Sequence, residues 1–157
     1  MNKLTLKTEG ETHVVVTRRF AASPEAVYRA HTDPALIQRW LLGPEGWTMP
    51  VCVNEAKPGG KIRYEWSNGK GQGFYLTGEY LELDPFRRIV HVERMFLPDP
   101  TPDNHIETKF DADGEGTLMT IRMTLPDAQT RKAMLASGME QGMETSYVRL
   151  EGIMQAA

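Results

Sequence analysis

The sequence is poor in cysteine, and Cys52 is its single example. A lone cysteine cannot form an internal disulfide or supply a multi-cysteine metal site, and it suits a reducing compartment. The histidines lack the spacing of metal ligands, so we expect no metal. They are His13, His31, His91 and His105.

Long apolar runs and an excess of positive charge are also missing. No window offers about 18 uninterrupted apolar residues, and residues 1–7 lack the apolar core of a signal peptide. With 18 Lys and Arg against 21 Asp and Glu, the formal net charge is -3. Nothing basic is available to coat a phosphate backbone. We therefore expect a cytoplasmic protein that neither enters a membrane nor binds nucleic acid.

What the sequence does contain is ordinary globular composition, with 40% hydrophobic and 25% charged residues over a length of 157. Domains commonly have roughly 100 to 200 residues, so we expect one domain over residues 1–157. Within it, residues 1–12 are expected to form either a less ordered lead-in or an edge strand.

Local patterns predict the order of the elements. Residues 13–20 are rich in β-branched side chains and predict a strand, and Ser23-Pro24 and Asp33-Pro34 predict the starts of two short helices. Two-residue alternation between turn signals predicts six further strands. They are expected at 47–55, 61–67, 73–83, 88–96, 105–111 and 117–124. Apolar residues at three- and four-residue steps predict one long amphipathic helix from Asp127 to Met154.

These elements permit few arrangements, because only the last helix is large enough to cover the apolar face of the sheet. We expect an α+β fold in which a curved antiparallel sheet of about seven strands wraps around a long C-terminal helix. Such a sheet commonly leaves space between its concave face and the helix, and that space is a favoured ligand site.

Several segments resemble the START-like (SRPBCC) superfamily. They are residues 17–34, Arg39-Trp40, Gly43-Pro44, 57–61, 78–85, Gly116-Thr117 and 138–142 with Leu150. Their order is similar to that in the homologues of the activator of the heat-shock protein 90 ATPase. The resemblance covers nearly the whole chain and implies the helix-grip fold. His31 and Leu41 depart from it, since this branch often has Trp at both positions.

Aromatic and thioether side chains supply the candidates for a cavity wall, and filling the core is their other role. Gly138 and Gly142 are expected to leave the last helix without side chains at one place, which makes room for a ligand. The residues expected to border the cavity are Trp40, Trp47, Tyr64, Trp66, Phe74, Tyr75, Phe96, Met139, Gly142 and Met143.

Four residues are weak candidates for acid/base catalysis. They are His91, Glu93, Glu65 and Tyr64. His91 and Glu93 share one face of a strand, where a carboxylate beside an imidazole makes an acid/base pair. We expect that face to be the solvated one. No serine or cysteine has the surroundings of a nucleophile, and no glycine-rich loop opens a helix as a phosphate site would.

We therefore expect a domain without a cofactor that binds a small hydrophobic or amphipathic molecule between the sheet and the C-terminal helix, without catalysis. A cyclase or hydrolase that uses the same cavity is one alternative. A chaperone-associated role in the stress response, implied by the resemblance, is another, although we expect the separate chaperone-binding domain of the full-length activators to be absent. Exposed strand edges also make a homodimer an open alternative.

Overall fold

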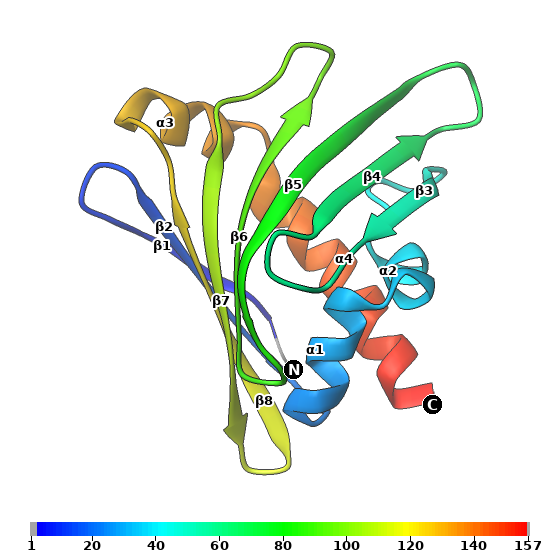
Figure 1. Cartoon of the computed structure of the whole chain (residues 1–157), viewed down its shortest axis with the longest axis vertical. Coiled ribbons are helices and arrows are strands. Elements are labelled where there is room, and N and C mark those ends of the chain that lie inside the picture. The colour runs from blue at the N-terminus through cyan, green and yellow to red at the C-terminus, as the bar shows by residue number, and fades with distance from the viewer. Residues whose placement is uncertain (1–2, 157) are drawn as a thin grey trace.

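The structure is a computed structural model that describes residues 3–156, so that residues 1, 2 and 157 of the expected domain lie outside the described part. Strands precede and follow two short helices, and two further helices end the chain (Figure 1). In order, the elements are β1 (Thr5–Glu9), β2 (His13–Phe20), α1 (Pro24–Thr32), α2 (Pro34–Trp40), β3 (Thr48–Asn54), β4 (Lys61–Ser67), β5 (Gly73–Asp84), β6 (Arg88–Phe96), β7 (Asn104–Asp113), β8 (Gly116–Thr124), α3 (Ala128–Ala136) and α4 (Met139–Ala156).

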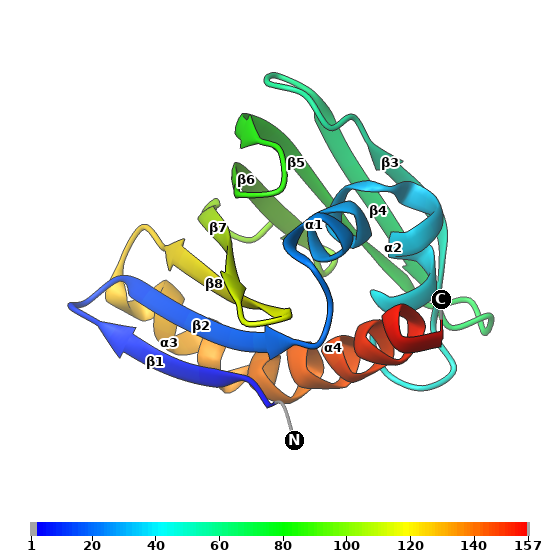
Figure 2. The same cartoon turned by 90° about the horizontal axis from the view of Figure 1, so that it is seen from below.

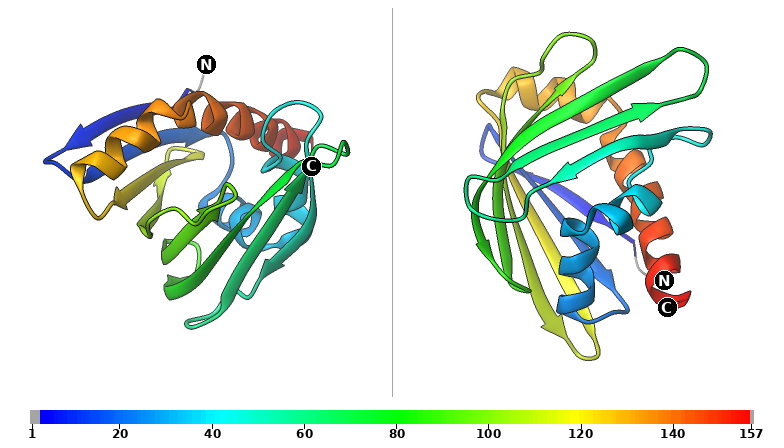
Figure 3. Two further views of the ribbon diagram at one scale, coloured as in Figure 1. Left: turned by 90° about the horizontal axis from the view of Figure 1, so that it is seen from above. Right: turned by 45° about the vertical axis from the view of Figure 1, so that its right-hand side comes forward.

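The strands form one antiparallel sheet in the order β1-β2-β8-β7-β6-β5-β4-β3. The sheet curves around α4, with β1, β2 and β8 on one side of the concave space and β3 to β6 on the other (Figures 2 and 3). This arrangement confirms the predicted helix-grip fold. The sheet has one strand more than expected, because residues 5–9 pair with β2 along the edge.

The two short helices begin where the sequence predicts, because their first residues satisfy exposed backbone N–H groups. The Ser23 hydroxyl accepts from the Ala26 backbone N–H at 3.2 Å, and Asp33 does the same for Ala35 at 3.0 Å. Both caps precede a proline, whose missing N–H costs nothing in the first helical turn. The helices lie in the open mouth of the sheet, and α2 packs next to α4 (Figure 2).

The expectation of one unbroken helix from Asp127 to Met154 is wrong. The helix α3 ends at Ala136, and α4 begins at Met139. Between them Gly138 has a φ of 83°, a left-handed conformation that residues with a Cβ adopt at a cost. The chain therefore bends at Gly138, and α3 covers one end of the concave space while α4 crosses it.

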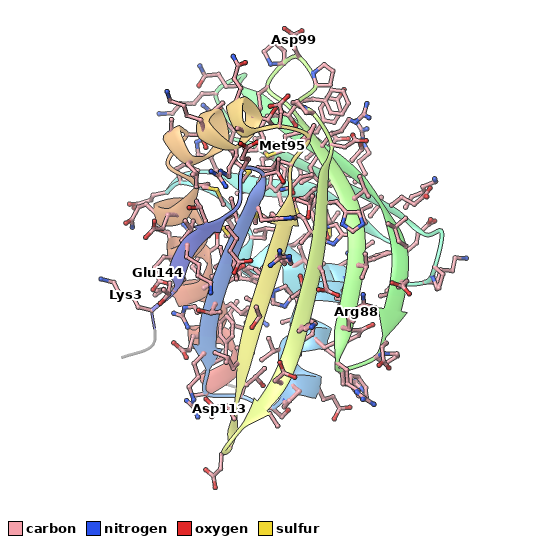
Figure 4. The ribbon with its side chains drawn as sticks, turned by 90° about the vertical axis from the view of Figure 1, so that its left-hand side faces the viewer. Lys3, Arg88, Met95, Asp99, Asp113 and Glu144 are labelled. Carbon is pink, nitrogen blue, oxygen red and sulfur yellow. The ribbon has the colours of Figure 1, made fainter. Side chains whose placement is uncertain are left out.

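One charged side chain lies in the core beneath α4. The Arg18 side chain is fully buried, and its Nε donates to Glu144 Oε1 at 3.0 Å. Its Nη1 lies 3.3 Å from Glu151 Oε2, further along the helix. The Leu4 backbone N–H also donates to Glu144 Oε1, at 3.1 Å, and Figure 4 shows Glu144 close to Lys3. These bonds fasten α4 to the beginning of the chain and to β2.

Candidate ligand-binding site

A cavity of about 610 Å³ lies between the concave face of the sheet and the helices. Its walls come from every layer of the fold: the helices α1 to α4, the strands β4 to β8 and the loop that follows β6. Most lining side chains are apolar. They include Ile37, Trp40, Ile62, Trp66, Leu76, Ile89, Met95, Ile106, Phe110, Ile121, Met123, Met134, Met139 and Met143.

The tryptophans of the wall have their polar atoms occupied by the protein itself. The Trp40 Nε1–H donates to the Ala30 carbonyl at 2.9 Å, and the Trp66 Nε1–H donates to the Leu41 carbonyl at 2.8 Å. Satisfied in this way, the indoles need no polar partner from a ligand, and their rings contribute apolar surface to the wall.

Two tyrosine hydroxyls are held by one amide on β3. Asn54 Nδ2 donates to Tyr64 Oη at 2.7 Å, and Tyr80 Oη donates to Asn54 Oδ1 at 2.8 Å. Burial raises the pKa of both phenols, and it raises the pKa of Tyr147 on α4 as well. The nearby carboxylate of Glu93 adds to each rise in pKa. All three therefore remain neutral at physiological pH, which removes Tyr64 as a general base.

The inner face of β6 carries the polar part of the wall. His91 and Glu93 line the cavity, with His91 Nε2 at 3.4 Å from Glu93 Oε2. Their side chains are 17% and 23% exposed. The expectation that this face is solvated is wrong, because Ile89 and Met95 lie on the same face and turn it toward the core. We call His91, Glu93 and the neighbouring Asn104 of β7 the polar cluster.

His31 is a lining residue that sequence reasoning did not assign to the site. Its Nδ1 lies 2.7 Å from the Val27 carbonyl, and its ring meets Trp40 and Phe110 edge-on at 5.0 and 5.5 Å. Burial, with a smaller contribution from nearby His91, lowers the pKa of His31 to about 4 against the opposing effect of the Val27 hydrogen bond. The departure from the family pattern at position 31 is the one signal in the sequence that points to this residue.

The structure brings together half of the residues expected to border the cavity. Those that line it are Trp40, Tyr64, Trp66, Met139 and Met143. Trp47 and Phe74 lie one layer further out, where Phe74 stacks on Trp66 at 4.8 Å and Trp47 packs on Phe74 at 5.3 Å. They support the wall without lining it.

The remaining candidates do not line the cavity. Tyr75 stacks on Phe96 at 4.4 Å, and the Arg63 guanidinium covers the Tyr75 ring. The Glu65 Oε2 lies 2.7 Å from the Nε of the same Arg63, so Glu65 does not form a catalytic pair within the cavity. Gly142 lies on an exposed face of α4, where a Cβ would meet no packed neighbour within 4 Å, so it does not create the cavity.

Two further features bear on the kind of site. Among the described residues, no group of three or more His, Cys, Asp or Glu side chains is arranged to hold a metal ion. The described helices also include none with the length and apolarity that crossing a membrane requires.

A curved antiparallel sheet closed by a C-terminal helix over an apolar cavity defines a START-like helix-grip domain. The chain belongs to the family described as activator of Hsp90 ATPase homolog 1-like protein, whose model matches residues 21–155. No curated protein matches the chain.

Solved structures from several bacteria share the fold. A protein from Rhodobacter sphaeroides has 30% sequence identity and a TM-score of 0.93, with 99% of this chain and 100% of that chain covered. A protein from Chromobacterium violaceum has 27% identity and a TM-score of 0.75, and the match covers 90% of this chain and 96% of that chain. A protein from Mycobacterium smegmatis has 19% identity and a TM-score of 0.86, and the match covers 98% of this chain and 97% of that chain. At this identity the likeness is one of fold alone.

Proposed function

We propose that the protein binds a small hydrophobic or amphipathic molecule in the cavity between the sheet and α4. The observation that carries this proposal is a space of about 610 Å³ whose walls are mostly apolar and whose indoles are already hydrogen-bonded within the protein. Burying apolar surface contributes about 25 cal/mol per Å², so a ligand can be held with few polar contacts.

We place this function in the cytoplasm. Cys52 is only partly buried, and desolvation raises the pKa of its thiol to about 11. The thiol is therefore protonated and unreactive at neutral pH, which suits a structural cysteine in a reducing compartment.

A homologous series of alcohols tests whether the cavity accepts an apolar chain. Isothermal titration calorimetry with hexanol, octanol and decanol should show the dissociation constant falling about fourfold for each added methylene, because each buried CH₂ contributes about 0.8 kcal/mol. Absence of measurable binding by all three alcohols would overturn the proposal.

A pair of tryptophan substitutions on α4 locates the site. Met143 lines the cavity, whereas Val148 is 56% exposed on the same helix. Met143→Trp should fill the space and weaken decanol binding by about tenfold or more. The control Val148→Trp should bind as the wild type does. Equal affinity in both variants would place the ligand elsewhere.

A second function, a cyclase- or hydrolase-type enzyme, is favoured by the position of His91 and Glu93 inside the same cavity. Paired in this way, an imidazole and a carboxylate can move a proton to or from a bound substrate. Native mass spectrometry of protein purified from cells would detect a retained molecule. If that molecule is a substrate, His91→Ala should abolish its turnover and leave its binding nearly unchanged.

A further inference from the structure

Three buried side-chain atoms in the described residues have no hydrogen-bond partner, and all three belong to residues that line the cavity. They are His31 Nε2, His91 Nδ1 and Asn104 Oδ1. Buried polar groups in proteins nearly always have a partner. The gathering of such atoms around one cavity indicates that a bound molecule supplies what the protein does not.

Each of these three atoms is an acceptor. His31 Nδ1 faces the Val27 carbonyl at 2.7 Å, so it carries the proton and leaves Nε2 with a lone pair. His91 Nε2 faces the Glu93 carboxylate in the same way, which leaves Nδ1 as the acceptor of the neutral ring. Asn104 Oδ1 is a carbonyl oxygen. A complementary ligand must therefore donate hydrogen bonds.

Glu93 adds negative charge to these acceptors. It lies directly opposite Gly78 on β5 and Asn104 on β7. A Cβ at Gly78 would lie 2.7 Å from the Val92 carbonyl oxygen and 3.4 Å from the Glu93 Cβ, so β5 places no side chain against Glu93 at this position. Arg94, the other charged residue along the cavity, is held by Asp103 with Nη2 to Oδ1 at 2.6 Å.

We propose that the ligand carries a basic amine on an apolar body, and that its ammonium group donates to Glu93 and to the surrounding acceptors. This inference rests on the proposed function and names the chemistry of the ligand. An ammonium has up to three N–H donors and forms stronger hydrogen bonds with a carboxylate than a neutral group does. A carboxylate-bearing ligand would bring a second negative charge to Glu93 and is therefore selected against.

Four probes with the same ten-carbon chain test this selectivity by calorimetry on the full chain at neutral pH, below their micellar concentrations. Decylamine should bind about tenfold more tightly than decanol, and decanoate about tenfold more weakly. Decyltrimethylammonium, a cation without an N–H donor, should bind more weakly than decylamine. This order requires no variant.

A matched pair of isosteric substitutions assigns the effect to one carboxylate. Glu93→Gln should abolish the tenfold advantage of decylamine over decanol. The control Glu65→Gln removes a carboxylate that pairs with Arg63 and does not line the cavity, so it should leave all four affinities unchanged.

The outcomes separate the two proposals. Decanol binding with no advantage for decylamine, or an equal affinity for decyltrimethylammonium, would overturn the amine inference and leave the proposed function standing. An advantage that survives in Glu93→Gln would overturn the role of Glu93. Failure of every probe to bind would overturn the proposed function itself.

Discussion

At the scale of single residues, His31 shows how the cavity controls a titratable group. Burial lowers the pKa of its imidazole to about 4, from an ordinary value of 6.5. Above pH 6.5 the ring is neutral in both the folded and the unfolded chain. Between pH 6.5 and 4 the unfolded chain binds the proton and the folded chain does not, so the free energy of unfolding decreases as the pH falls.

His31→Phe should therefore weaken the acid sensitivity of the fold. Between pH 7 and 5, the wild type should lose about 2 kcal/mol more of its unfolding free energy than the variant does, because one pKa unit corresponds to about 1.4 kcal/mol. Urea unfolding at the two pH values measures the difference. His105→Gln, at an exposed position on β7, is the control and should behave as the wild type. Parallel losses in the wild type and His31→Phe would contradict the prediction.

At the scale of elements, two glycines near the start of α4 have different roles. Gly138 has a positive φ of 83° and joins α3 to α4, whereas Gly142 has helical geometry and lies within the first turns of α4. A Cβ at Gly142 would meet no packed neighbour within 4 Å. One glycine is therefore required by the backbone, and the other only loosens the helix.

Gly142→Ala should stabilise the protein by up to about 1 kcal/mol, since glycine is a poor residue for a helix interior. Gly138→Ala should destabilise it by about 1 kcal/mol, since alanine resists a positive φ. Urea unfolding of the two variants checks both signs. A loss of stability in Gly142→Ala would show that this position is more crowded than the structure indicates.

Gly142→Leu should leave decanol binding unchanged, because the position is exposed and lies outside the cavity wall.

At the scale of the whole molecule, the Arg18 ion pairs join the beginning of the chain to its end. Arg18 lies on β2, and its partners Glu144 and Glu151 lie on α4, 15% and 17% exposed. The cavity exists because α4 is held across the sheet. Arg18 therefore supports the site from a position that does not line it.

Arg18→Ala should cost about 3–5 kcal/mol of unfolding free energy, because it removes the buried cation that pairs with Glu144 and Glu151 beneath α4. Arg19→Ala is the matched control. Arg19 pairs with Asp113 at an exposed position, with side chains 39% and 52% exposed, and its loss should cost no more than about 1 kcal/mol. Denaturant unfolding of both variants measures the difference. Similar small losses would show that other contacts hold α4 in place.

The tertiary structure decided which side chains line the cavity and which form the buried ion pairs. Alternation along β6 favoured the wrong face, because Val90, Val92 and Phe96 make one face more apolar than the face that carries His91 and Glu93. The sheet pairing turned His91 and its carboxylate neighbour toward the helix. The partners of Arg18 on α4 lie more than a hundred residues away, so no local pattern could reveal them.

The sequence by itself determined the elements and the family resemblance. Ser23 and Asp33 cap their helices with atoms two or three residues away, and strand alternation reflects the geometry of a few neighbouring residues. Such signals are short in range and can be read along the chain. The break at Gly138, the phase of β6 and the polar cluster depend on how the sheet and helices pack, and only the folded chain brings those distant surfaces into contact.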